Sequence, residues 1–290
     1  MAQPPRNAII TGSASGLGRA LALRLAQDGW QMALVDVNES GNAETLKLVQ
    51  AAGGSGFTHR MDVAQPDAWQ QLHDLLRARW QTLDLLVNNA GVAGSGEVGK
   101  YSLDDWHWIL GINLNAGIYG CHFFIPWLKE NPRGANIINT ASLAAMAAKP
   151  GMAGYNVAKA GMLSLSETLF GELKPFKIGV TVICPAFFQT NLLTDGRLEK
   201  VDRDMASKMM KVANFTADDV AAEAIRAMQT GKLYVVLPRQ GRTFWRLKRW
   251  FPSYILNMLA KDWEKQLAHV AKRAKTPSPT APAEPQEVSR

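Results

Sequence analysis

Three polar residues in the middle of the chain, Ser142, Tyr155 and Lys159, have the types and spacing of a proton-transfer site. Tyr155 and Lys159 are four positions apart, so on a helix they lie on one face, one turn from each other. A phenol has a pKa of about 10, but a neighbouring ammonium favours the phenolate and lowers that pKa. Ser142 could then hold a carbonyl or hydroxyl oxygen beside the phenol. The spacing therefore predicts proton exchange between Tyr155 and a bound substrate.

A glycine-rich segment near the N-terminus has the features of a dinucleotide-binding unit. Residues 7–10 are a short apolar run, a helix is expected over residues 19–28, and a buried strand over residues 32–37. Glycines between the first strand and the helix allow a tight turn, and they let backbone amides approach a pyrophosphate. The predicted cofactor contacts of this unit are Gly12, Ser15, Gly16, Leu17, Gly18 and Asp36.

The residues around Asp36 favour NAD(H) over NADP(H). A carboxylate at the end of the second strand accepts hydrogen bonds from ribose hydroxyls, and it repels a 2′-phosphate. Two positions where a basic residue could pair with that phosphate hold Ser15 and Val37 instead. The alternative reading, an acid simply exposed at the end of a strand, fits this pattern less well.

Apolar strands of about five residues alternate with helices along residues 6–238. This alternation predicts an α/β fold with a doubly wound parallel sheet and helices on both faces. Residues 185–213 show no clear periodicity and are predicted to be a long loop, of the kind that often covers a substrate. Met205, Met209 and Met210 have helix-like spacing within it, so they either line an apolar pocket or form the buried face of a helix.

The overall composition indicates a sizeable core, because 47% of the residues are apolar. Two distant cysteines cannot form a disulfide framework, and the five histidines lack metal-ligand spacing, so no metal is predicted. The first seven residues lack the apolar run of a signal peptide, and no run of eighteen apolar residues is present. We therefore expect a cytoplasmic protein without a membrane-spanning segment, with a peripheral position on the inner face of a membrane left open.

The net charge of +7 is concentrated near the C-terminus. Residues 239–275 contain ten Lys or Arg and two Asp or Glu, a net +8, whereas residues 1–238 have no net charge. A neutral body argues against a nucleic-acid partner. Residues 239–261 have the pattern of a basic, aromatic amphipathic helix interrupted at Pro252, which packs over the active site, joins a partner subunit or lies on an anionic membrane surface.

The sequence thus predicts three parts. Residues 1–238 form a dinucleotide-binding catalytic domain, and residues 239–275 form a basic amphipathic helical extension. Residues 276–290, rich in Pro, Ala, Ser and Glu, are predicted to be a disordered tail.

Together, these motifs resemble the short-chain dehydrogenase/reductase family, in its branch of single-domain enzymes. The resemblance covers residues 6–238. Four matches in the right order carry it: Thr11-Gly12-x-x-x-Gly16-x-Gly18, Asn88-Asn89-Ala90-Gly91, Asn113 between Ile112 and Leu114, and Ser142 with Tyr155 and Lys159. One departure is Ala186, which follows Pro185 where the family usually has glycine, so the geometry of this loop is left open.

The resemblance implies a Rossmann-type domain with a seven-stranded parallel sheet that uses NAD(H) or NADP(H), assembled as a dimer or tetramer. Tyr155 would be the general acid and base, and Ser142 would anchor the substrate oxygen. Lys159 would lower the pKa of the tyrosine and hold the nicotinamide ribose, and Asn113 would position a water in a proton relay to Lys159. The further cofactor contacts that it implies are Asp62, Val63, Asn89, Ala90, Gly91, Pro185 and Thr190.

We therefore expect an NAD(H)-dependent oxidoreductase that interconverts an alcohol and its ketone or aldehyde. Phe187 and Phe188 would make the substrate pocket apolar, so a small hydrophobic substrate is predicted. A non-catalytic dinucleotide-binding sensor or scaffold is the alternative, and it is disfavoured because Tyr155 and Lys159 are both present. A sugar-nucleotide epimerase or dehydratase shares the Tyr-x-x-x-Lys pattern, but it needs a larger C-terminal substrate domain.

Overall fold

The structure is a computed structural model that describes residues 5–188, 193, 196–198 and 200–275. The predictions for Thr190 and for residues 276–290 therefore lie outside the described residues. The contacts within the chain divide it into two compact units, Met1–Arg246 and Leu247–Arg290.

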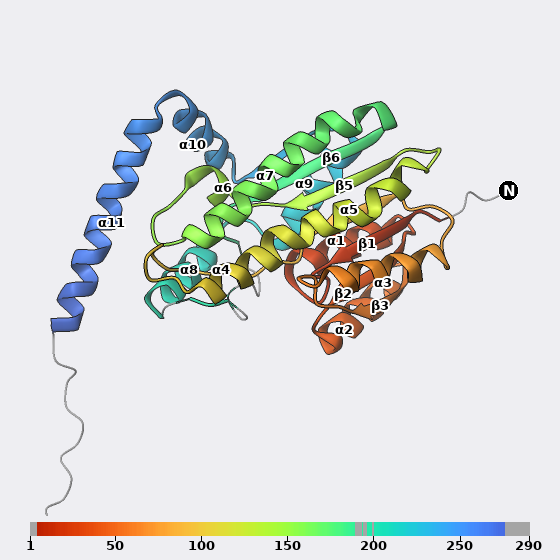
Figure 1. Ribbon diagram of the computed structural model, residues 1–290, viewed down its shortest axis with the longest axis horizontal. Helices are drawn as coiled ribbons and strands as arrows, with labels where there is room; N and C mark the ends of the chain where they lie inside the picture. Colours follow the sequence, from red (N-terminus) through yellow and green to blue (C-terminus); the bar gives the residue numbers. More distant parts are fainter. Residues whose placement is uncertain (1–4, 189–192, 194–195, 199, 276–290) are drawn as a thin grey trace, which may run out of the picture. The chain divides into compact units, whose positions relative to one another are not determined.

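The first unit is built on one sheet of seven parallel strands in the order β3-β2-β1-β4-β5-β6-β7 (Figure 1). This arrangement, with helices on both faces, confirms the predicted fold class. The strands are β1 (Asn7–Thr11), β2 (Gln31–Asp36), β3 (Ser55–Arg60), β4 (Leu85–Asn88), β5 (Ala135–Thr140), β6 (Ile178–Pro185) and β7 (Tyr234–Leu237).

Helices cover the two faces of this sheet. The helical elements before β6 are α1 (Gly16–Gln27), α2 (Glu39–Ala51), α3 (Pro66–Arg77), α4 (Leu103–Leu110), η1 (Gly111–Asn115), α5 (Ala116–Lys129), α6 (Ala144–Ala147), α7 (Ala153–Leu173) and η2 (Lys174–Phe176). Those after β6 are α8 (Lys200–Lys211), α9 (Ala217–Gln229), α10 (Arg239–Trp250) and α11 (Pro252–Lys275).

The strands read as continuous apolar runs because both faces of the sheet are buried. Ala8 and Ile10 of β1 belong to a core cluster with residues of α1 and α9, whereas Ile9 belongs to a cluster with residues of α3, α5 and α7. Successive side chains of a strand point to opposite faces, so β1 supplies both clusters.

The strand order reverses between β1 and β4. From β1 the chain winds outward through β2 to β3, and from β4 it winds the other way to β7. In open parallel sheets, ligands bind at such a switch point, in the crevice outside the carboxyl ends of the strands. The glycine-rich segment follows β1, Asn89 follows β4, and Ser142 follows β5, so the predicted site residues gather at this edge.

One continuous helix, Leu103–Lys129, contains α4, a π-helical turn (η1) and α5. Ser102 caps the N-terminus of this helix, because its Oγ accepts a hydrogen bond of 3.0 Å from the backbone N–H of Asp105. Its length of 27 residues, and the mean hydropathy of 1.2 in its most apolar 18-residue window, would suffice to cross a membrane, although no such segment was expected from uninterrupted apolar runs. Of that 18-residue window, 44% is buried inside the protein. The core helices of soluble proteins can be equally long and apolar.

The largest difference from the sequence prediction lies in residues 185–213. The predicted loop contains the helix α8, in which Ala206 and Met210 are buried while Met209 is exposed. Met210 therefore belongs to the buried face of this helix. Helix α2 begins at Glu39, because Asn38 caps it by accepting the backbone N–H of Gly41 at 3.0 Å.

Candidate active site

The glycine-rich turn brings α1 into close contact with the ends of two strands. A Cβ on Gly18 would lie 2.0 Å from the carbonyl oxygen of Gly12. A Cβ on Gly12, whose φ is +66°, would lie 2.9 Å from the Cα of Ala90. Larger residues would push the helix away. Because they are absent, the N-terminus of α1 lies at the switch point, where its backbone N–H groups can bind an anion.

Ser15 and Leu17, two other predicted cofactor contacts of this turn, differ in whether their side chains can reach a cofactor. Ser15 is the extended residue that precedes α1, and its side chain makes no capping hydrogen bond to the helix. Leu17 is buried in the core cluster of α1 and α9. A contact between Leu17 and a dinucleotide would therefore involve its backbone.

Asn89 and Thr11 tie together the carboxyl ends of three strands. Thr11 Oγ1 accepts the backbone N–H groups of Asn89 and Ala90 at 2.9 and 3.1 Å. Asn89 Nδ2 donates to the carbonyl of Thr11 at 3.0 Å, and its Oδ1 accepts from Thr140 Oγ1 at 3.2 Å. The structure thus gives the Asn89 side chain a role in holding the glycine-rich turn, and the sequence analysis missed Thr11 and Thr140 as its partners.

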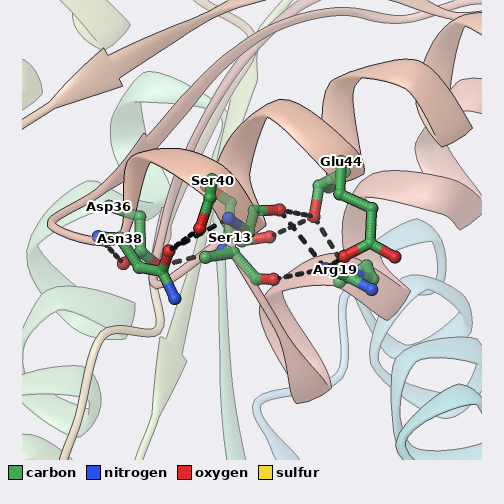
Figure 2. Close-up of polar contacts among 9 residues, drawn as sticks. Ser13, Arg19, Asp36, Asn38, Ser40 and Glu44 are labelled. Atoms are coloured by element: carbon green, nitrogen blue, oxygen red, sulfur yellow. Dashed lines mark hydrogen bonds and ion pairs between the residues drawn. The ribbon is translucent and has the colours of Figure 1, made fainter.

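Asp36 lies at the end of β2 and holds the glycine-rich turn from the other side. Its Oδ2 accepts the backbone N–H of Ala14 at 2.9 Å, and its Oδ1 accepts the backbone N–H of Asn38 at 2.9 Å (Figure 2). Each carboxylate oxygen has further lone pairs. Asp36 can therefore position the turn and still accept hydrogen bonds from ribose hydroxyls.

Arg19 is the basic side chain nearest in sequence to this turn, and an internal network holds it. Its guanidinium donates to Glu44 Oε2 at 2.8 Å, to Thr45 Oγ1 at 2.9 Å and to the carbonyl of Ala14 at 2.7 Å (Figure 2). These contacts occupy the cation that could otherwise turn toward a 2′-phosphate.

The next pair of predicted cofactor residues follows β3, at the edge of the sheet. Asp62 is exposed, and its Oδ1 accepts the backbone N–H of Ala64 at 2.9 Å. Val63 is buried, and its carbonyl accepts the indole N–H of Trp69 at 2.8 Å. The structure therefore leaves an exposed carboxylate at this strand end, and adenine contact by this pair stays a prediction.

The structure brings together Ser142, Tyr155 and Lys159. Ser142 follows β5, and its Oγ hydrogen-bonds the phenol of Tyr155 on α7. It also accepts the backbone N–H of Ala144 at 3.1 Å. Lys159, one turn further along α7, has its Nζ 5.8 Å from the centre of the Tyr155 ring, and it donates to the carbonyl of Thr140 at 2.9 Å. A hydroxyl, a phenol and an ammonium thus meet beside the ends of β4 and β5.

Burial controls the protonation of this group. Tyr155 and Lys159 are only 7% and 3% exposed. Desolvation raises the pKa of Tyr155, against the opposing effect of its hydrogen bond to Ser142, and lowers the pKa of Lys159 to about 8. The expected lowering of the tyrosine pKa by Lys159 is therefore not the net effect in the protein alone. Because its pKa is raised, Tyr155 keeps its proton at neutral pH.

Asn113 lies in the π-helical turn and is almost completely buried. Its side chain forms a closed pair with Val92: Nδ2 donates to the Val92 carbonyl at 2.9 Å, and Oδ1 accepts the Val92 N–H at 3.0 Å. A Cβ on Gly91 would lie 2.7 Å from Asn113 Oδ1 and 3.3 Å from Lys159 Nζ. The segment after β4 thus passes between Asn113 and Lys159, and a water relay between them stays a prediction.

The residues after β6 differ in how they relate to the site. The carbonyl of Pro185 accepts the backbone N–H of Leu143 at 2.9 Å, which holds the Ser142 segment against β6. Phe188 is buried in the core, where its ring stacks on Phe215 at a centroid distance of 5.8 Å. The expectation that both phenylalanines line the substrate pocket is therefore retained only for Phe187, which is half-buried.

A buried polar chain beneath these groups was missed by the sequence analysis. Asn88 Nδ2 donates to Asn139 Oδ1 at 2.9 Å, and Asn139 Nδ2 donates to Ser166 Oγ at 3.0 Å. It links β4, β5 and α7, so it sets the position of the helix that carries Tyr155 and Lys159. The available signal was the presence of asparagines in otherwise apolar strands.

The residues at this edge fit a nicotinamide dinucleotide. Gly12 and Gly18 leave a cradle that side chains would fill, the α1 N-terminus can bind its pyrophosphate, and Asp36 can accept its ribose hydroxyls. Lys159 Nζ, which lies near Tyr155 and Gly91, is a cation that could bind a second ribose.

The chain is similar to known proteins over most of its length. The family model described as short chain dehydrogenase matches residues 6–201. The 3beta-hydroxysteroid dehydrogenase of Mediterraneibacter gnavus is 31% identical over 206 residues, which cover 71% of this chain and 72% of that protein. The probable oxidoreductase EphD of Mycobacterium tuberculosis is 29% identical over 232 residues, which are 77% of this chain but only 39% of that longer relative.

A solved structure extends the similarity to nearly the whole chain. The short chain dehydrogenase/reductase from Burkholderia phymatum, crystallised in complex with NAD, has a TM-score of 0.78 and 29% identity. The match covers 97% of this chain and 98% of that one. The motifs, the strand order and these matches agree, and the chain belongs to the short-chain dehydrogenase/reductase family.

Proposed function

We propose that this protein is an NAD(H)-dependent oxidoreductase that interconverts a hydrophobic alcohol and its ketone or aldehyde. The observation that carries the proposal is the hydrogen-bonded pair of Ser142 and Tyr155, with Lys159 one turn away, at the edge of the sheet that holds the glycine cradle. A sensor or scaffold would not need this group of residues. Burying the lysine ammonium and the tyrosine hydroxyl costs folding free energy, which a catalytic role would explain.

The proposed roles follow from the contacts. A bound nicotinamide would supply or accept the hydride at the substrate carbon. Ser142 Oγ orients the substrate oxygen toward Tyr155; the phenol donates its proton to that oxygen in reduction, and the phenolate accepts the proton from it in oxidation. Lys159 stabilises the phenolate left after donation, because an ammonium beside a phenolate in a buried site interacts more strongly than in water.

The substrate class is the less constrained part of the proposal. Phe187, a half-buried aromatic residue after β6, favours a hydrophobic compound, and the similarity to a protein named as a hydroxysteroid dehydrogenase supports the same class. The test is a turnover screen with NAD(H) and NADP(H) across steroid, fatty and aromatic alcohols and ketones. NADH binding without turnover of any of these compounds would favour the sensor alternative.

Cofactor preference is expected to depend on Asp36. Asp36→Asn removes the charge that repels a 2′-phosphate but keeps an oxygen for the Ala14 N–H, so the turn retains its support. We expect the ratio of kcat/KM for NADP(H) to that for NAD(H) to rise about ten-fold or more, the scale of one charged hydrogen bond. Glu39→Gln, an exposed acid at the start of α2, is the control and should leave the ratio unchanged. An unchanged ratio in Asp36→Asn would refute the assignment.

We also propose a homodimer or homotetramer joined through α5 and α7. Both helices carry exposed apolar side chains, namely Ile118 on α5 and Val157 and Phe170 on α7. Exposed apolar residues on neighbouring helices favour self-association. Light scattering of the protein after gel filtration tests this, with a monomer as the contrary result.

A further inference from the structure

The second unit carries large aromatic side chains in solvent. Trp250 ends α10, Phe251 follows it, and Tyr254 lies in the first turn of α11; they are 80%, 59% and 71% exposed. Met258, four positions after Tyr254 and therefore on the same face of α11, is also exposed. Clusters of exposed aromatic residues often mark surfaces that bind another protein, a membrane or a ligand.

The same face of α11 continues with positive charge. Lys261 and Lys265 are seven and eleven positions after Tyr254, so they share its face, and both are exposed. We call Trp250, Phe251, Tyr254, Met258, Lys261 and Lys265 the aromatic-basic face.

This face is separate from the stripe that α11 uses for packing. Ile255, Leu259 and Trp263 are spaced four apart on another side of the helix; Ile255 is buried, and the other two are half-buried. The exposed aromatic residues are therefore not part of the stripe formed by Ile255, Leu259 and Trp263.

The charge distribution selects the occupant. The basic excess of the protein lies in residues 239–275, which carry a net +8, while residues 1–238 are neutral. A symmetric contact between two copies would bring together two surfaces that both carry this positive excess, which is unfavourable. An anionic bilayer offers what both halves of the face need: an interfacial layer for Trp, Tyr and Phe, and phosphates for Lys.

We propose that the aromatic-basic face docks the protein onto the surface of an anionic lipid bilayer. In this arrangement α11 lies in the plane of the interface, with its aromatic side chains and Met258 at the boundary between headgroups and acyl chains. Lys261 and Lys265 contact lipid phosphates. The membrane surface would then hold the enzyme where apolar compounds are concentrated, although the docking itself does not depend on the proposed chemistry.

Vesicle sedimentation with the full-length protein tests the proposal. We expect binding to phosphatidylcholine vesicles that contain phosphatidylglycerol, weaker binding to phosphatidylcholine alone, and release at high salt. Trp250→Ala/Phe251→Ala/Tyr254→Ala and Lys261→Glu/Lys265→Glu should each lower the partition coefficient by about ten-fold or more. Because these side chains are exposed, the fold should persist, as circular dichroism and NADH binding can verify.

A matched control separates this surface from overall charge. Lys47→Glu/Lys232→Glu reverses two exposed lysines of the first unit and changes the net charge equally, so it should leave vesicle binding nearly unchanged. Equal losses in both charge-reversal variants would show non-specific attraction and overturn the proposal. It would also be overturned if the full-length protein ignored anionic vesicles, or if the aromatic variant changed only oligomeric mass or the KM for a soluble substrate.

Discussion

Replacing Tyr155 by phenylalanine is expected to lower turnover by about three orders of magnitude, within the range attributed to general acid–base catalysis. The phenol is the buried proton donor that hydrogen-bonds Ser142, and phenylalanine removes only its oxygen. The ring still fills its space, so the glycine cradle and Asp36 are unaffected. NADH should therefore bind within a few-fold of its original affinity, measured by fluorescence titration alongside steady-state turnover.

The chain offers a matched control for this experiment. Tyr101 also has a buried hydroxyl, and within the described residues that oxygen has no hydrogen-bond partner. Tyr101→Phe removes the same atom from a half-buried ring that lies beside Gly154, and it should keep most of the activity. A Tyr155→Phe variant that retained activity within ten-fold of the parent would exclude the proposed proton transfer.

Replacing Lys159 by methionine is expected to have opposite effects on activity and stability. Turnover should fall by about two to four orders of magnitude, because nothing then stabilises the phenolate of Tyr155. Burial lowers the pKa of Lys159 from 10.5 to about 8, so the folded protein holds this ammonium at a cost of about 3 kcal/mol at neutral pH. Methionine removes that cost, although the carbonyl of Thr140 loses a donor, which offsets about 1 kcal/mol.

The pH dependence gives the sharper measurement. Between about pH 8 and pH 10.5 the unfolded chain holds a proton on Lys159 that the folded chain has lost, so the parent gains stability as the pH rises. Below pH 8, Lys159 is protonated in both states, so the full free-energy cost of the buried ammonium applies. The stability advantage of Lys159→Met in urea unfolding should therefore be constant at lower pH and shrink above pH 8. If the stability curves of the parent and of Lys159→Met instead ran parallel across this pH range, the assignment would be contradicted.

The sequence predicted the elements that periodicity and capping define. The alternation of buried strands and helices and the break at Pro252 follow from local patterns, and the structure contains both of them. Helix α8 was left as one of two alternatives, because its polar composition does not stand out within the predicted loop and few of its described side chains are buried.

Contacts between polar groups that are distant in the sequence could not be predicted from it. The glycine motif indicates where a dinucleotide would lie, but it does not reveal that Asp36 accepts the N–H of Ala14 or that Arg19 is held by Glu44. The phenylalanine pair illustrates the same limit. Phe187 and Phe188 are adjacent, yet the second stacks on Phe215, a residue from a later segment. Proximity in sequence cannot decide which of two neighbours faces the core.

The π-helical turn at Gly111–Asn115 constrains how this chain can change by insertion and deletion. Its defining hydrogen bond joins the N–H of Ala116 to the carbonyl of Gly111, five residues earlier, so the turn contains one residue more than an α-helix would. Deleting one residue there would let Leu103–Lys129 close as a regular helix, and it would rotate everything before the deletion by about 100°. The Asn113 amide would then leave Val92. Such a deletion would improve the backbone hydrogen bonds of the helix but would abolish function. Homologous chains should therefore tolerate few insertions or deletions at these five positions.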